Sequence, residues 1–359
     1  MLSEVPDILI ILLGFLLAFA ITFFGIPRII RLARQKGLYD IPGTRTSHNE
    51  PTPRLGGAMI FAGVILTSVL FTDFENAAKL KYLIAGMLIL FFIGIKDDII
   101  TLTPPKKILG QIFASGIIVV LGNIRIVDCY AFFGMEYLSY AISIIISILI
   151  FMALINSINL IDGIDGLAAG VGIIASVAFG TWFFMFGHIS MAVICVSLLG
   201  SLIAFLYFNV FSKRNKIFLG DTGSQLIGFL LAVFAVSFLE LNASIPDDTK
   251  LGTAPAITLS ILIVPVIDTL RVIYIRLRNK KSIFKADHNH IHHAVLSVSK
   301  THLIASLTIL SVNITLIIFT IVFRHLGNTI LIIALGILST VLIYLLNYYR
   351  HKNQTDQVK

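Results

Sequence analysis

Long, continuous apolar runs recur along the whole chain and limit its fold more than any other feature. Each run covers about 18–22 residues, the length that a helix needs to cross the hydrocarbon core of a bilayer. Of the 359 residues, 57% are hydrophobic and only 13% are charged, and the mean hydropathy is +0.95. Because the runs are continuous and do not alternate, they predict membrane-spanning helices and not the strands of a membrane barrel.

These runs predict an all-α, polytopic membrane protein with about eleven transmembrane helices. We place the spans at about 8–30, 56–72, 81–95, 108–122, 140–158, 164–185, 189–210, 224–240, 255–275, 302–323 and 328–347. They occupy about 8–347 and are followed by a polar C-terminal tail at 348–359. With no convincing internal repeat and no separate soluble domain, residues 1–359 are expected to form one integral-membrane domain.

The positive charges are distributed unevenly between the two sides that these spans define. Of the 27 Lys and Arg residues, 22 fall in the odd-numbered loops, the adjoining helix ends and the C-terminal tail. The even-numbered loops hold only Lys79, Lys81, Arg125, Lys250 and Arg324. The positive-inside rule therefore predicts an N-terminus outside and a cytoplasmic C-terminus, in an inner or plasma membrane. The net charge of +8 is then mostly an orientation signal, and nucleic-acid binding is not expected.

Polar residues interrupt the chain at the end of the fifth span. Asn156, Asn159, Asp162 and Asp165 are three residues apart, so they lie on roughly one face if the helix continues. An ionised Asp at the bilayer centre costs about 2.5–3.5 kcal/mol on insertion scales. Such residues usually face a cavity, a metal or a polar substrate, so this spacing predicts a site at the membrane boundary.

Two further acidic motifs fall on the same predicted cytoplasmic side. Asp97 and Asp98 follow the third span, and two adjacent carboxylates need a cation such as a metal or Lys107. Asp221 lies in the segment 218–224, where it would suit Mg²⁺, and the amides of the next helix start would hold a phosphate. The alternatives without a catalytic role are a solvated charged loop for Asp97 and Asp98, and an Asp-Gly turn with a Thr or Ser helix cap for the segment 218–224.

Basic groups complete this face. Arg45, His48 and Arg54 lie in a loop stiffened by prolines and are candidates for binding an anion. The histidine-rich segment 288–293 suggests zinc, and a phosphate- or nucleotide-binding loop is equally plausible. Asp268 lies inside the ninth span, where a pair with Arg271 is the structural alternative. Whether Asp268 and the histidine segment are catalytic or structural is left open.

Taken together, acidic motifs, glycine hinges and basic groups on one membrane face are the requirements for phosphoryl transfer. The competing class is a transporter or flippase of a polyprenyl-linked or sugar-phosphate substrate, since intramembrane Asp and broken helices occur there too. One-sided motifs favour surface chemistry over transport.

The order of these motifs resembles the polyprenyl-phosphate N-acetylhexosamine-1-phosphate transferases, the WecA/TagO/MraY type of glycosyltransferase family 4. The resemblance covers roughly residues 40–293. It is carried by Pro-x-Pro-Arg-x-Gly-Gly at 51–57, Lys-Asp-Asp at 96–98, Asn-x-x-Asn-x-x-Asp-Gly-x-Asp-Gly-Leu-Ala at 156–168, Phe-Leu-Gly-Asp-x-Gly-Ser at 218–224 and His-x-His-His at 290–293.

The resemblance implies transfer of a sugar-1-phosphate, GlcNAc-1-phosphate or a related N-acetylhexosamine, from a UDP-sugar to undecaprenyl phosphate. UMP is released, a lipid-linked cell-envelope glycan is initiated, and Mg²⁺ or Mn²⁺ is required. The expected catalytic residues are Asp97, Asp98, Asp162 and Asp165, and the expected metal ligands are Asp221 and Asp98. The expected substrate-binding residues are Arg45, His48, Arg54, Lys107, Asn156, Asn159, His290, His292 and His293.

Two departures from the family pattern leave alternatives open. Ile291 interrupts the histidine run, which favours the WecA/TagO side over the muramoyl-pentapeptide branch. Arg45-Thr-Ser-His48 differs from the Arg-Lys-x-His that is more usual on that side, so the sugar stays open. The sequence also leaves open which glycan is made downstream and whether the protein forms a homodimer. It does not decide whether the lipid phosphate attacks directly or the reaction passes through a covalent enzyme intermediate.

Overall fold

The structure is a computed structural model that describes residues 5–39, 51–72, 79–130, 137–246, 248–280, 291–299 and 301–356. Within these ranges every regular element is a helix, which confirms the all-α fold class. The helices are α1 (Asp7–Lys36), α2 (Gly56–Phe71), α3 (Leu80–Ile99), α4 (Pro104–Gly116), α5 (Tyr140–Ile161), α6 (Leu167–Met185), α7 (Ile189–Leu206), α8 (Gly220–Ala243), α9 (Ala254–Ile261), α10 (Ile263–Arg278), α11 (Ile291–Ser299), α12 (His302–Val322) and α13 (Asn328–Asp356). The π-helical turns η2 (Ile117–Leu121) and η4 (Tyr207–Phe211) extend α4 and α7, and η5 (Arg324–Leu326) is a short 3₁₀ turn.

Each of the eleven predicted spans coincides with one of these helices or with a pair of them. Eight helices of the described chain are long and apolar enough to cross a membrane: α1, α4 with η2, α5, α6, α7 with η4, α8, α12 and α13. The pair α9 and α10 adds a ninth if it is one bent span, and α2 is apolar but shorter. The protein is therefore a multi-pass membrane protein, and the count of eleven and the orientation stay predictions.

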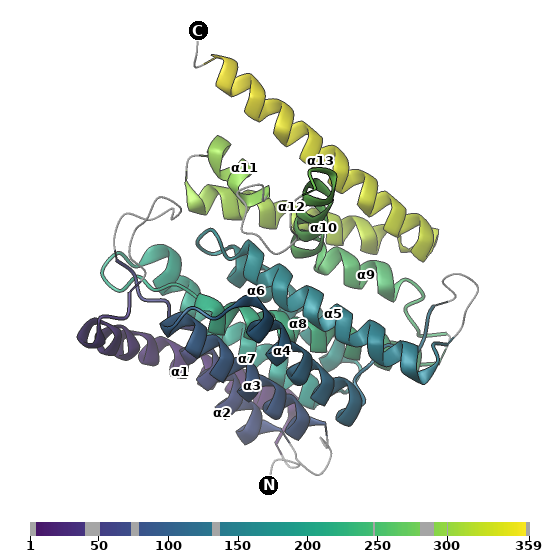
Figure 1. The fold of residues 1–359 in the computed structure, drawn as a ribbon. Coiled ribbons are helices and arrows are strands. Elements are labelled where there is room, and N and C mark those ends of the chain that lie inside the picture. Colours follow the sequence, from purple (N-terminus) through teal and green to yellow (C-terminus); the bar gives the residue numbers. More distant parts are fainter. Residues whose placement is uncertain are drawn as a thin grey trace.

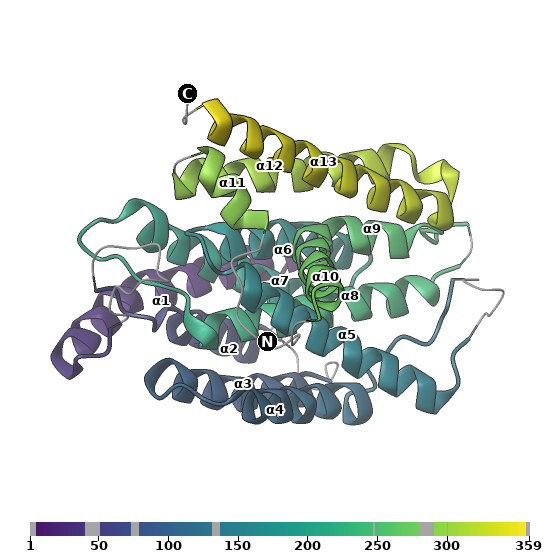
Figure 2. The same ribbon diagram turned by 45° about the horizontal axis from the view of Figure 1, so that its top comes forward.

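Helix α8 is the centre of the bundle. Every residue from Thr222 to Phe238 is buried, so this stretch of the helix has no exposed face, as expected of a helix enclosed by others. Helices α2, α3, α5 and α6 pack around it, and α1 and α7 pack behind α2. Figure 1 shows this arrangement, with α12 and α13 forming a separate layer at the C-terminal side. In Figure 2, α3 and α4 lie on the opposite side of the bundle from α12 and α13.

The ninth predicted span is not one straight helix. It breaks at Leu262, and α10 departs from the direction of α9 by 76°. Pro265 explains the break, because its ring collides with the carbonyl of the residue four positions earlier, which is Ile261 at the end of α9. The bend directs α10 against α5.

Candidate active site

The carboxylate of Asp98, near the end of α3, lies over the start of α8. Its Oδ1 accepts a hydrogen bond from the N–H of Asp221 at 2.6 Å. Its Oδ2 accepts two from Thr222, from the N–H at 3.0 Å and from the hydroxyl at 2.6 Å. The first N–H groups of a helix lack partners within the helix, and a carboxylate there also complements the helix dipole. Asp98 therefore occupies amides at which the sequence predicted a bound phosphate, and its role as a metal ligand stays a prediction.

The proline-containing segment before α2 runs alongside the segment before α8. The N–H of Phe218 donates to the carbonyl of Pro53 at 2.8 Å, and the N–H of Gly56 donates to the carbonyl of Phe218 at 3.0 Å. A Cβ on Gly57 would overlap the backbone of Gly223, so glycine is what lets α2 approach α8 this closely. The backbone hydrogen bonds thus bring two motifs together that are about 160 residues apart in the sequence.

Lys107 joins two of the predicted acidic residues. Its ammonium pairs with Asp97 and lies 3.1 Å from Oδ1 of Asp221. The other oxygen of Asp97, Oδ1, accepts the N–H of Leu102 at 2.5 Å, which fixes the turn between α3 and α4. A positive charge between two carboxylates offsets their mutual repulsion. The structure therefore brings together Asp97, Lys107 and Asp221, three residues singled out from the sequence.

Two asparagines of α5 face this cluster from the other side. The amide of Asn159 donates to Oδ1 of Asp221 at 2.9 Å and to the hydroxyl of Ser224 at 2.8 Å. One turn earlier, the amide of Asn156 donates to Oε1 of Gln111 at 2.8 Å. These contacts hold α5 against α4 and α8 and orient the Asp221 carboxylate.

The sequence placed Asn156, Asn159, Asp162 and Asp165 on one helix face if the helix continued. It does not continue, because α5 ends at Ile161, and only the two asparagines share that face. Asp162 and Asp165 lie in the turn that follows, which closes at Gly166 with a positive φ of 80°. Asn209 fixes this turn by accepting the N–H of Gly166 at 2.8 Å.

Asp165 points into a polar network of its own. Its Oδ2 lies 2.7 Å from the ammonium of Lys216 and 3.4 Å from Nδ1 of His302. Burial acts to raise the pKa of Asp165, but the hydrogen bonds and charges of His302 and Lys216 outweigh it and hold the pKa below its ordinary value. Asp165 is therefore ionised at neutral pH and links the α5–α6 turn to α12.

Asp162 has the opposite electrostatic environment. Desolvation raises the pKa of Asp162 well above its ordinary range, and the negative charges of Asp221, Asp165 and Asp98 raise it further. The positive charge of Arg54 acts in the other direction. A cation beside it would relieve the repulsion among these groups.

The carboxylates suit a divalent cation that is held partly by substrate. Across the described ranges, no three His, Cys, Asp or Glu side chains converge closely enough to hold a metal ion by themselves. Mg²⁺, however, is usually bound by one or two carboxylates together with substrate phosphates and water. Asp221 keeps Oδ2 clear of hydrogen bonds from described residues, and Asp162 lies close enough for the two charges to interact. This donor set fits Mg²⁺ or Mn²⁺ and does not suit a closed zinc site.

Part of the predicted substrate-binding set lies outside the described residues. Arg45, His48 and His290 belong to this part. His292 and His293 are described in their backbone only, as the second and third residues of α11. Arg54 is exposed and lies before α2.

Several polar residues near the site were not assigned from the sequence. Lys216 was counted only among the cytoplasmic charges, and His302 carries no local signal because it begins a membrane helix. Gln225 is buried on α8, and its Oε1 lies 3.4 Å from Nε2 of Gln111. A polar residue one position after a glycine-rich acidic motif is the single signal that could have indicated Gln225.

Comparison with known proteins agrees with the motifs. The family model for glycosyl transferase family 4 matches residues 80–239. The chain is 32% identical over 310 residues to the decaprenyl-phosphate N-acetylglucosaminephosphotransferase of Mycobacterium tuberculosis (strain CDC 1551 / Oshkosh), covering 80% of this chain and 76% of the relative. It is 28% identical over 274 residues to the undecaprenyl-phosphate alpha-N-acetylglucosaminyl 1-phosphate transferase of Escherichia coli O157:H7, covering 76% and 72%. With the five motifs in order and this coverage, the chain belongs to glycosyl transferase family 4, the family that its sequence motifs predicted.

Proposed function

We propose that this protein transfers an N-acetylhexosamine-1-phosphate from a UDP-sugar to a polyprenyl phosphate and releases UMP. The names of the relatives support N-acetylglucosamine as the first sugar to test and undecaprenyl or decaprenyl phosphate as the acceptor. The observation that carries the proposal is the convergence of Asp97, Lys107, Asn159 and Asp221, which come from four different helices or helix ends.

In the proposed reaction an oxygen of the lipid phosphate attacks the sugar-linked phosphorus of the UDP-sugar. The bond from that phosphorus to the bridging oxygen breaks, and UMP leaves with this oxygen. A phosphate monoester has its second pKa near about 6, so the acceptor is largely deprotonated at neutral pH and needs little help from a base. Bound Mg²⁺ or Mn²⁺ would neutralise charge that develops on the transferred phosphate.

The residues of the chain then have mainly positioning roles. Asp221 and Asp162 would hold the cation, and Asn159 keeps the Asp221 carboxylate oriented. Lys107 holds Asp97 beside the reacting groups, where Asp97 would orient the lipid phosphate. Asp98 maintains the start of α8 and so the position of Asp221. This distribution matches phosphoryl transfer, in which positioning and charge neutralisation supply most of the catalysis.

We further propose that the reaction takes place at the cytoplasmic face of an inner or plasma membrane, within one domain formed by residues 1–359. The supporting observation is that the acidic motifs lie at the end of α3, after α5 and at the start of α8, next to the positively charged loops. The product would initiate a lipid-linked cell-envelope glycan.

The purified protein in lipid nanodiscs with UDP-GlcNAc, undecaprenyl phosphate and Mg²⁺ provides the test. We expect UMP and lipid-diphosphate-sugar in equal amounts, and none of either after chelation of the metal. A panel of other UDP-N-acetylhexosamines decides the sugar. Movement of a lipid-linked sugar across a vesicle bilayer without UMP release would overturn the proposal in favour of a transporter.

A further inference from the structure

One acidic side chain borders a mainly apolar cavity, which Ile161 and Leu167 at the two ends of the α5–α6 turn also line. The cavity has a volume of about 240 Å³ and lies mainly between α10, α12 and α13. Of its 16 lining residues Asp268 alone is ionisable, and Thr308 and Ser339 are the other polar ones. Asp268 is only 2% exposed. A buried carboxylate in such surroundings requires a specific partner, because an unsatisfied charge there is costly.

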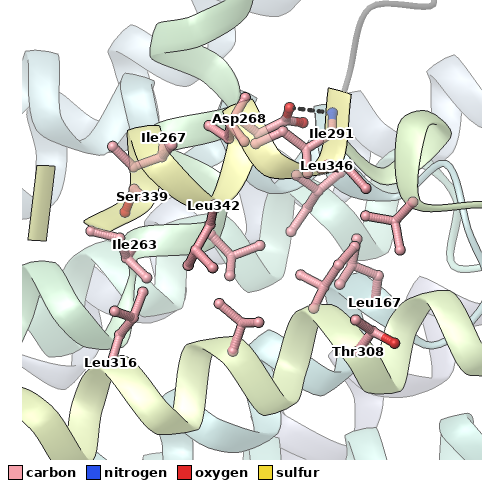
Figure 3. A pocket seen from close by; sticks show the side chains of 16 residues that line it. Leu167, Ile263, Ile267, Asp268, Ile291, Thr308, Leu316, Ser339, Leu342 and Leu346 are labelled. Atoms are coloured by element: carbon pink, nitrogen blue, oxygen red, sulfur yellow. Dashed lines mark hydrogen bonds between the residues drawn. The ribbon is translucent and has the colours of Figure 1, made fainter. Parts of the chain in front are cut away.

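One partner of Asp268 is the beginning of α11. Oδ1 of Asp268 accepts a hydrogen bond from the N–H of Ile291 at 2.7 Å, as Figure 3 shows. Ile291 is the first residue of α11, so its N–H has no acceptor within the helix. Asp268 thus acts as an N-terminal cap supplied by a different helix, and its negative charge also complements the α11 dipole.

The bond ties α11 to a helix that is itself fixed to the active site. Next to Asp268 on α10, the hydroxyl of Thr269 bonds the hydroxyl of Ser157 on α5 at 2.9 Å. Ser157 lies between Asn156 and Asn159, which face the acidic cluster. The rest of α11 is held by burial of Ala294 and Val295 and by packing against α12 and α13.

The two residues after Ile291 are His292 and His293, which are expected to bind substrate. We propose that Asp268 is a positioning residue that fixes the first turn of α11, and with it these histidines, relative to α5. The inference rests on the proposed function, in which the histidine segment, expected to bind a phosphate or a nucleotide, would bind the UDP-sugar. Loss of the Asp268 acceptor should therefore weaken donor binding and leave the lipid side of the reaction unaffected.

Amide hydrogen exchange tests the positioning without any turnover. We expect Asp268→Ala to speed exchange in residues 291–299 by about three- to thirtyfold, as loss of a helix cap predicts. Asp268→Asn keeps an oxygen acceptor and should change exchange by less than about twofold. If Asp268→Ala fails to insert, Asp268→Ser replaces it, since its hydroxyl is polar but too short to reach Ile291. Unchanged exchange in the Ala or Ser variant would overturn the proposal.

Kinetics then test whether the positioning matters for the donor. In Asp268→Ala the KM for the UDP-sugar should rise at least about fivefold, while kcat and the KM for the lipid stay within about twofold of the wild type. In Asp268→Asn the KM for the UDP-sugar should stay near the wild-type value. In the double variant with His293→Ala, the rise in this KM should be clearly less than the product of the two single rises. Both changes would weaken the same contact, that of the histidine with the UDP-sugar.

Multiplicative combination of Asp268→Ala with His293→Ala, or equal losses in the Asn and Ala variants, would contradict the positioning role. The two proposals fail in different ways. A wild-type protein that releases no UMP fails the proposed function, while the exchange result still decides whether Asp268 orders α11. UMP release together with unchanged exchange fails only the positioning.

Discussion

Asp98 accepts two hydrogen bonds from Thr222, one from the backbone N–H at 3.0 Å and one from the hydroxyl at 2.6 Å. The two residues are 124 positions apart in the sequence. Their contact seats the start of α8 on the end of α3, and Asp221 lies immediately before Thr222. The geometry of the acidic cluster therefore depends on a cap that is not part of the same helix.

Removing this cap should lower the stability of the protein more than it changes the Mg²⁺ concentration that activity requires. We expect Asp98→Ala to lower the free energy of unfolding by about 1–3 kcal/mol, because partly buried donors lose their acceptor. Thr222→Val, which removes only the hydroxyl, should cost less. Thermal unfolding and Mg²⁺ titration of activity check this. An Asp98→Asn variant with wild-type stability but a much higher Mg²⁺ requirement would instead make Asp98 a metal ligand.

Asp221 is the residue at which loss of charge should be most damaging to turnover. Asp221→Asn preserves the size of the side chain and removes the charge that Mg²⁺ needs, so we expect at least about a hundredfold loss of kcat. Expression and thermal stability should remain near those of the wild type, since Asn159 and Lys107 retain an oxygen acceptor. Near wild-type activity of this variant at limiting Mg²⁺ would remove Asp221 from the metal site.

Asp97 should show a dependence on pH that Asp221 does not. If Asp97 assists deprotonation of the lipid phosphate as well as orienting it, Asp97 matters most where that phosphate is partly protonated, near about pH 6. We expect Asp97→Asn to lose more activity at about pH 6 than at about pH 8.5, and Asp221→Asn to lose a similar factor at both. Rates across this range provide the measurement. Equal losses for Asp97→Asn would favour a positioning or nucleophilic role.

The ion pair of Asp165 and Lys216 should contribute stability only while Asp165 is ionised. The pKa of Asp165 is lowered in the folded protein, despite burial, by His302 and Lys216. Its contribution is therefore complete above the unfolded value near about 4 and is lost as the pH falls through the folded pKa. Lys216→Met should lower the Tm at pH 7, and the difference from wild type should shrink in acid. Lys213→Met, at an exposed lysine of the same loop, is the matched control. A difference that is constant with pH would exclude the ion pair as its cause.

Labelling of single cysteines tests the orientation of the chain. In a background without Cys129 and Cys195, a cysteine at exposed Asp248 should react with an impermeant reagent added outside intact cells. A cysteine at exposed Lys213 should react only after the membrane is opened, because it lies on the side with most of the positive charge. The reverse pattern would place the candidate site on the outer face.

The sequence by itself was sufficient for the features that depend on neighbours along the chain. Apolar runs of membrane-crossing length marked the helices, and Asp97, Asn159 and Asp221 stood out because polar residues are costly at a membrane boundary. Their assignment to one site followed from motif order, and the structure does bring them together: Lys107 pairs with Asp97 and Asp221, and Asn159 donates a hydrogen bond to Asp221.

Only the tertiary structure decided which groups pair across the bundle. Asp97 and Asp98 are adjacent and chemically identical, yet one pairs with Lys107 and the other caps α8. Asp165 continues the spacing of Asn156 and Asn159, but the end of α5 at Ile161 directs it to Lys216 and His302. Asp268 stabilises a helix that begins 23 residues later. Each pairing depends on where helices end and how they pack, and a buried carboxylate takes the donor that packing brings within reach.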